Sequence, residues 1–317
     1  MRKLRLFAAR AAHLLFVLFG VSFLVYLLLD LLPGDTAEVI VASSSNPSPD
    51  AVEQIRAQLG LDQPFFVRYL DWLGGALTGD LGVSYRTGET VVASIASRLP
   101  VTLELLILAE VVSLLIAIPL AVFAAQRRDT VFDRATAVFT FGLQSVPNFV
   151  VALVMIVVFA VVLRLLPALG FVPLEVSVAG NLKSMIIPVA ALSSTLIPLY
   201  TRVLRNEVIR TLQEDFILMA RAAGIKPLDI LFRYTLKPSL PTLITVVGIN
   251  IGTLLGGTII IELISGLPGV GTLLYTAINT RDYVLVQGIV LFIACGYVLA
   301  NFLVDLLYTY LDPRVQA

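Results

Sequence analysis

"VTLELLILAEVVSLLIAIPLAVFAA", residues 101–125, is a run of apolar residues whose only charged side chains are Glu104 and Glu110. A helix rises 1.5 Å per residue, so about 20 apolar residues cross the roughly 30 Å hydrocarbon core of a bilayer. The stretch is long enough for this and contains no internal glycine. It therefore predicts a transmembrane helix.

Five further apolar runs have similar lengths. Hydrophobic residues make up 58% of the chain and charged residues 14%, whereas soluble domains carry about 25% charged residues. Strands of an outer-membrane barrel would be about 10 residues long and alternating, which these runs are not. The sequence thus predicts an all-α polytopic membrane protein with six transmembrane helices, and Pro147 should kink the third. The other five runs are His13–Leu32, Ala135–Leu163, Leu182–Thr201, Leu240–Ser265 and Tyr283–Leu311.

The distribution of basic residues predicts the orientation of the spans. Fifteen of the 22 Lys and Arg residues fall on the side of the N-terminus, and such residues are enriched in cytoplasmic loops. With an even number of spans, we expect both termini in the cytoplasm and the protein in the cytoplasmic membrane. Residues 1–32 should form a short cytoplasmic end and a retained first span rather than a cleaved signal peptide. The net charge of zero gives no reason to expect a nucleic-acid partner, and membrane lipid is the expected surroundings.

The extracytoplasmic segment, residues 33–100, is too long to lack local structure. Ser48 as N-cap, Pro49 at the first position and Gly60 as terminator predict one short helix. "PFFVRYLDWLGG", residues 64–75, predicts a second, with Tyr69 and Trp72 suited to the membrane interface.

The remaining residues, 101–317, should form a core of five helices interrupted by a cytoplasmic segment at 202–239. Connections between bundle helices usually need about 2 to 8 residues, so a longer segment should contain structure of its own. "EDFILMARAA", residues 214–223, has acids at its start and predicts a short helix that Gly224 ends, and Pro227 is placed to begin another.

The end of this predicted helix gathers small residues, Ala220, Ala222, Ala223 and Gly224, around Arg221. Small side chains allow a partner to approach closely, and the arginine could pair with a carboxylate on that partner. The same residues could instead form an amphipathic helix lying on lipid headgroups. The pattern alone does not decide between docking and lipid binding.

Several motifs resemble those of the B-type permease subunits of ABC importers for oligopeptides, dipeptides and nickel. The family's EAA-x3-G signature aligns with residues 218–224, where Leu218 and Met219 depart from it and "ARAAG" matches the form usual in this branch. The resemblance covers nearly the whole chain in order. Its other stretches are "LLPGD" (31–35), "LGLDQP" (59–64), "GDLGVS" (79–84), "RLPVTLEL" (98–105), "SGLPGVG" (265–271), "RDYVLVQG" (281–288) and "VDLLYTYLDPR" (304–314).

The resemblance implies a type I ABC importer permease fold that moves peptides or a similar small solute by alternating access. It implies four partners: a second homologous permease, two ATP-binding subunits and an extracytoplasmic solute-binding protein. ATP and Mg would be held by the ATP-binding subunits, and this chain has no G-x-x-x-x-G-K-[ST] motif of its own. Residues implied to couple the permease to its ATPase are Asp215, Phe216, Met219, Ala220, Arg221, Ala222, Ala223, Gly224 and Pro227.

Two features of the spans are candidates for the transport pathway. Gly248, Gly252 and Gly256 form an i, i+4, i+8 stripe beside Asn250, which could pack within the chain, meet the second permease or line the pathway. Glu110 lies about 15 Å into its span, where it could contact a cationic group of the solute or a structural partner.

Two other classes of function remain open at this point. A stand-alone secondary transporter or channel would need several ionisable groups at mid-membrane or an inverted repeat. Glu110 is the one such group, and no duplication is evident. An intramembrane enzyme is disfavoured because the only histidine, His13, lies at the start of the first span, so the chain has neither an H-E-x-x-H motif nor a serine and histidine pair deep in the bundle. No metal site is expected, and the single cysteine, Cys295, is expected to be a small packing residue.

Overall fold

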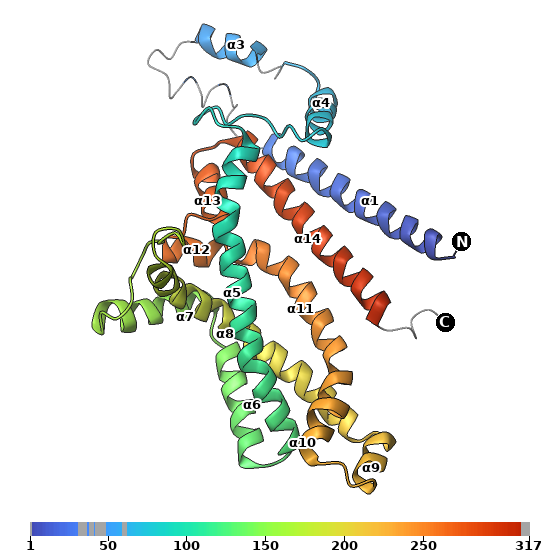
Figure 1. Cartoon of the computed structure of the whole chain (residues 1–317). Coiled ribbons are helices and arrows are strands. Elements are labelled where there is room, and N and C mark those ends of the chain that lie inside the picture. Colours follow the sequence, from blue (N-terminus) through green and yellow to red (C-terminus); the bar gives the residue numbers. More distant parts are fainter. Residues whose placement is uncertain (1, 31–36, 38–40, 42–48, 59–61, 312–317) are drawn as a thin grey trace. The chain divides into compact units, whose positions relative to one another are not determined.

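The computed structural model describes residues 2–30, 37, 41, 49–58 and 62–311, and it is helical almost throughout. Within these residues the pairing of extended backbone is limited to an isolated bridge between Val83 and Thr90. The predicted all-α fold is confirmed. Figure 1 shows the helices, which are α1 (Arg2–Asp30), α3 (Pro49–Gln58), α4 (Phe65–Leu77), α5 (Val91–Gln126), α6 (Val131–Gln144), α7 (Asn148–Met155), η1 (Ile156–Val162), α8 (Val178–Leu212), α9 (Asp215–Ala222), α10 (Pro227–Asp229), η2 (Ile230–Leu236), α11 (Lys237–Gly257), α12 (Ile259–Ser265), α13 (Val270–Asn279) and α14 (Tyr283–Leu311).

Four helical stretches are long and apolar enough to cross a membrane: α5, α8, α14 and the continuous helix that runs from α10 to the end of α11. Two bent pairs, α6 with α7–η1 and α12 with α13, each pass the same test as a unit. The last predicted span begins and ends where α14 does. The fourth is longer than predicted, because α8 continues eleven residues beyond Thr201, to Leu212.

Two predicted spans are interrupted in ways that the apolar runs did not indicate. The expected kink at Pro147 is a complete break, with α6 and the following helix at 92° to each other. Pro147 caps α7 with an extended ψ of 139°, and proline favours such a conformation just before a helix begins. The fifth run is also not one helix. The helix α11 ends with Gly256 and Gly257, and glycine is a poor helix former.

The chain divides into two compact units, and the first contains residues 1–102 and 268–298. Within it α4 packs on α1 through aromatic rings, with Tyr69 contacting Phe23 at 5.4 Å and Tyr26 at 5.5 Å between centroids. The Tyr69 hydroxyl also lies 2.9 Å from Ser22 Oγ. Tyr69 is therefore buried against α1, and its suitability for the membrane interface stays a prediction. Pro49 begins α3 as predicted, and Ser48 and Gly60 lie outside the described residues.

A loop of residues 79–90 is fixed to the start of α14 in the same unit. Ser84 Oγ donates a hydrogen bond to Asp282 Oδ2, and Gly82 lies so close to Val284 that a Cβ there would be 2.8 Å from its side chain. The close approach explains the glycine, which also has a φ of 91°. Two motifs almost 200 residues apart, "GDLGVS" and "RDYVLVQG", thus form one structural feature.

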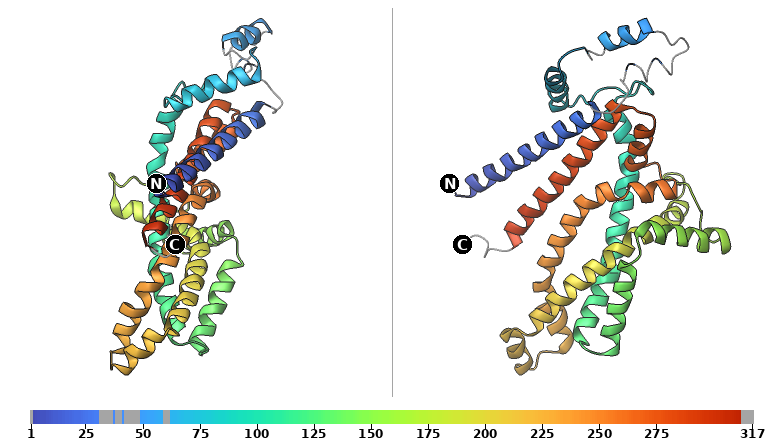
Figure 2. Two further views of the ribbon diagram at one scale, coloured as in Figure 1. Left: turned by 90° about the vertical axis from the view of Figure 1, so that its right-hand side faces the viewer. Right: turned by 180° about the vertical axis from the view of Figure 1, so that it is seen from behind.

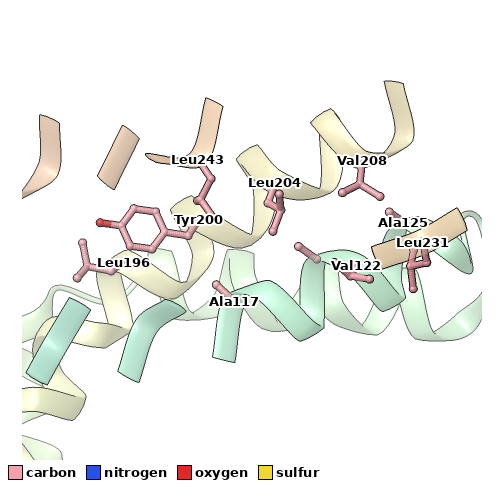
Figure 3. Close-up of a cluster of buried hydrophobic side chains, with 10 residues drawn as sticks. Ala117, Val122, Ala125, Leu196, Tyr200, Leu204, Val208, Leu231 and Leu243 are labelled. Carbon is pink, nitrogen blue, oxygen red and sulfur yellow. The ribbon is translucent and has the colours of Figure 1, made fainter. Parts of the chain in front are cut away.

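The second unit contains residues 103–267 and 299–317. Its hydrophobic core lies between α5 and α8, and η2 and α11 complete it. Leu196, Tyr200, Leu204 and Val208 recur every four residues, so they form one face of α8 opposite α5 (Figure 3). The α5–α6 turn and α9 lie at the same end of this unit, as both views of Figure 2 show.

Candidate functional site

The helix α9 and the turn that follows it begin and end within one residue of where the sequence predicts. Asp215 lies in the first turn, where its charge suits the helix dipole. At the other end Gly224 has a φ of 74°, and its N–H donates to the Arg221 carbonyl at 3.0 Å, while Ile225 N–H donates to the Ala220 carbonyl at 3.1 Å. This is a Schellman motif, in which glycine takes the left-handed position at least cost. Pro227 then begins α10, as predicted.

One face of α9 is fastened to the rest of its unit. Ile217 and Ala220 are buried against Ile230 of η2, and Ile225 and Tyr234 cover the contact. Ala220, one of the predicted coupling residues, is only 6% exposed and lies in this contact, not on the open face of α9. Its small size serves the packing between α9 and η2.

The opposite face of α9 is open and largely apolar. Phe216 is 40% exposed and Met219 65% exposed, and Asp215, Arg221, Ala222, Ala223, Gly224 and Pro227 are exposed as well. The structure therefore brings together every predicted coupling residue except Ala220 on an accessible surface. Exposed clusters of large apolar side chains are typical of surfaces that contact a protein partner or a membrane.

Three further apolar residues of the hairpin, outside the predicted set, are exposed: Leu218, Leu228 and Phe232. Leu228 and Phe232 are four residues apart on the helix that follows the turn, and more than half of each is exposed. Their spacing could have indicated a second exposed helical face. We call Phe216, Leu218, Met219, Leu228 and Phe232 the apolar surface of the α9–η2 hairpin.

The helix α8 leads directly into this hairpin and is tied to its neighbours by polar contacts. Thr211 Oγ1 lies 3.1 Å from Ser239 Oγ at the start of α11, and both side chains are buried. Farther back on α8, Arg205 forms an ion pair with Asp133 of α6 at 2.6 Å. These long-range pairs were not predicted, because nothing in the local sequence links partners so far apart.

Glu110 has a partner inside the second unit. The Tyr200 hydroxyl lies 2.9 Å from each oxygen of the Glu110 carboxylate, and Ser193 Oγ donates to the carbonyl of the adjacent Ala109 at 3.2 Å. Ser193 and Tyr200 are two turns apart on one face of α8, and they bond to the consecutive α5 residues Ala109 and Glu110. In this structure the buried Glu110 carboxylate joins two helices. This fits a structural partner better than a contact with a cationic group of the solute.

The glycine stripe of α11 has different surroundings along its length. A Cβ at Gly248 would overlap the side chain of Val304 in α14, so the glycine permits close helix contact. Gly252 is buried, whereas no atom lies within 4 Å of the Cβ position at Gly256. Asn250 Nδ2 donates to the Val246 carbonyl at 2.8 Å, within its own helix. The stripe thus packs intramolecularly at one end and is open at the other.

Metal ligation has no evident basis in the described part of the chain. Among these residues, no three His, Cys, Asp or Glu side chains gather so that they could hold a metal ion.

Comparison with known families accounts for nearly the whole sequence. Residues 117–317 match the family described as binding-protein-dependent transport system inner membrane component. Residues 3–106 match the N-terminal model of the corresponding membrane component.

Individual relatives are similar over almost their full length. A protein of Brucella abortus (strain 2308) that carries the name of a peptide transport system permease is 39% identical over 309 residues, covering 97% of each chain. The dipeptide transport system permease protein of Alkalihalophilus pseudofirmus is 31% identical and covers 95% of this chain and 96% of its own.

A solved structure confirms the architecture. An inward-facing form of the MetNI methionine ABC transporter includes a chain with a TM-score of 0.56 and 18% identity, covering 69% of this chain and 96% of that one. At this identity the likeness establishes the fold alone. Together with the apolar helices and the match over residues 117–317, it shows that the chain is a multi-pass protein belonging to the inner-membrane components of binding-protein-dependent transport systems.

Proposed function

We propose that this chain is the permease subunit of an ATP-driven importer that moves di- or oligopeptides across the cytoplasmic membrane. Its relatives named for peptide and dipeptide transport support the choice of solute. The observation that carries the proposal is the α9–η2 hairpin. It presents exposed apolar side chains next to the "ARAAG" sequence, while the other face of α9 packs against η2.

An ATP-binding subunit is the partner that this surface suits. Phe216 and Met219 would enter an apolar groove, and Arg221 would pair with a carboxylate at its rim. The small side chains of Ala222 and Ala223 would let the partner's backbone approach. ATP and Mg are then held by that subunit and not by this chain, which supplies only the mechanical connection.

The remaining composition of the transporter follows from the same proposal. A second homologous permease, two ATP-binding subunits and an extracytoplasmic solute-binding protein would complete it. The excess of basic residues on the α9 side supports a cytoplasmic location for that side and for both termini. Binding of ATP and of the loaded solute-binding protein must then favour the outward-open state over the inward-open one, since a ligand shifts an equilibrium only by its differential affinity.

The proposal is tested by changing the apolar surface without disturbing the anchored face. Met219→Glu places a charge on a side chain that is 65% exposed, so folding should be unaffected. We expect this variant to be inserted but to lose both the copurifying ATP-binding subunit and ATP-dependent peptide uptake. Val176→Glu is a matched control, because Val176 is 75% exposed and lies before α8, at the opposite end of that helix from α9.

Normal uptake and normal copurification in Met219→Glu would contradict the proposal. Uptake by the unaccompanied wild-type chain in liposomes, driven by an ion gradient, would instead support a secondary transporter.

A further inference from the structure

The ion pair between Arg205 and Asp133 has a geometry that fixes both distance and orientation. Arg205 Nε donates to Asp133 Oδ1 at 2.6 Å and its Nη2 donates to Oδ2 at 2.6 Å. Two parallel charge-assisted hydrogen bonds resist sliding and rotation, which a single point contact does not. Asp133 Oδ2 also accepts from the backbone N–H of Asp129 at 3.0 Å. One carboxylate therefore joins α8, α6 and the α5–α6 turn.

The carboxylate of the pair is shielded from solvent, and the pair as a whole is less exposed than the other ion pair near this end of α8. The side chain of Asp133 is 7% exposed and that of Arg205 26%. Arg210 and Glu207 also form an ion pair at 2.6 Å, but the Arg210 side chain is 73% exposed and both residues belong to α8. Exposed pairs contribute little to stability, and a pair within one helix cannot hold two helices together.

The position of the pair links it to the apolar surface of the α9–η2 hairpin. Arg205 lies seven residues, about 10 Å of helix, before Leu212, where α8 ends, and α9 begins three residues after Leu212. Arg202 adds a second contact to α6, donating to Gln144 Oε1 at 3.3 Å. The end of α8 is thus tied to α6 on one flank and, through the Thr211–Ser239 contact, to α11 on the other.

We propose that Arg205 and Asp133 are positioning residues that make α6 and the α5–α6 turn move together with α8 when a partner displaces α9. The proposal rests on the proposed function, because it requires that force enters at α9. Without the pair, α8 could shift against α6 while the hairpin still bound its partner. ATP hydrolysis would then continue with little transport.

The test compares transport with hydrolysis in the complete transporter, reconstituted in liposomes with its ATP-binding and solute-binding subunits. Asp133→Asn keeps the shape of the side chain but removes its charge, and Arg205→Lys keeps the charge but loses the bidentate geometry. We expect both to lower the peptide transported per ATP hydrolysed by roughly 3- to 30-fold, with the ATP-binding subunit still copurifying. Glu207→Gln is the matched control and should leave the ratio unchanged.

The proposal is overturned if either variant assembles and keeps the wild-type ratio. It is equally overturned if neither variant assembles, because the pair would then act in folding. Absence of any ATP-binding subunit from the wild-type complex would be a different result, since that would contradict the proposed function itself.

Discussion

Gly224 offers the sharpest test of how the turn after α9 shapes the docking surface. Its φ is 74°, and a side chain in this left-handed region costs about 1–2 kcal/mol. No atom lies within 4 Å of the Cβ position, so Gly224→Ala adds backbone strain and no steric overlap. A cost of about 1 kcal/mol corresponds to a roughly fivefold change in an equilibrium constant.

A graded series separates this strain from other effects. Asparagine tolerates the left-handed conformation better than alanine, and a β-branched residue tolerates it least. Proline also removes the N–H that donates to the Arg221 carbonyl and cannot adopt a positive φ. We therefore expect affinity for the ATP-binding subunit to fall in the order Gly, Asn, Ala, Val, Pro, with a loss of about fivefold for alanine.

The assay is a titration of the purified ATP-binding subunit against each variant in detergent. Gly142→Ala is the control: Gly142 lies within α6, has open space at its Cβ position and has no positive φ. It should leave the affinity unchanged. Equal affinities for Gly224 and its alanine variant, or a weaker complex with asparagine than with alanine, would refute the reasoning.

Three further predictions concern contacts away from the hairpin. Tyr200→Phe should destabilise the protein by about 1–3 kcal/mol, because it removes the hydroxyl that pairs with Glu110. In thermal unfolding, a double variant that also carries Glu110→Leu should recover most of this loss of stability. Additive losses from the two substitutions would exclude the pairing. Gly248→Ala should lower the free energy of unfolding by about 1–3 kcal/mol, because the added methyl group overpacks against Val304. Adding Val304→Ala should restore the melting temperature. If it does not, the two helices do not touch there. Ser84→Ala should speed trypsin cleavage in residues 79–90 about tenfold, since the buried hydrogen bond from Ser84 to the Asp282 carboxylate holds that loop. An unchanged cleavage rate would mean that the bond does not restrain the loop.

Local signals in the sequence predicted the elements whose structure depends on neighbouring residues. The bounds of α14, the start of α3 at Pro49 and the turn at Gly224 follow from apolar length, proline and glycine. Each of these signals acts within a few residues, so a single sequence suffices to read it.

Features that depend on distant residues were missed or misjudged. A proline indicates a disturbance in a helix but not its size, so the 92° break before Pro147 was expected only as a kink. The burial of Ala220 depends on Ile230, ten residues further on, so the local sequence does not reveal it. The pairing of Arg205 with Asp133 joins residues 72 positions apart, and no local pattern specifies it.

The central claim is that the open face of α9 is where an ATP-binding subunit docks, and a photo-activated cross-linker at position 219 tests it most directly. Position 219 is 65% exposed on that face, and position 176, which is 75% exposed, provides the comparison. We predict that position 219 captures a nucleotide-binding polypeptide in native membranes, identified by mass spectrometry, and that position 176 does not. Capture of lipid alone at position 219, with no nucleotide-binding chain, would contradict the account.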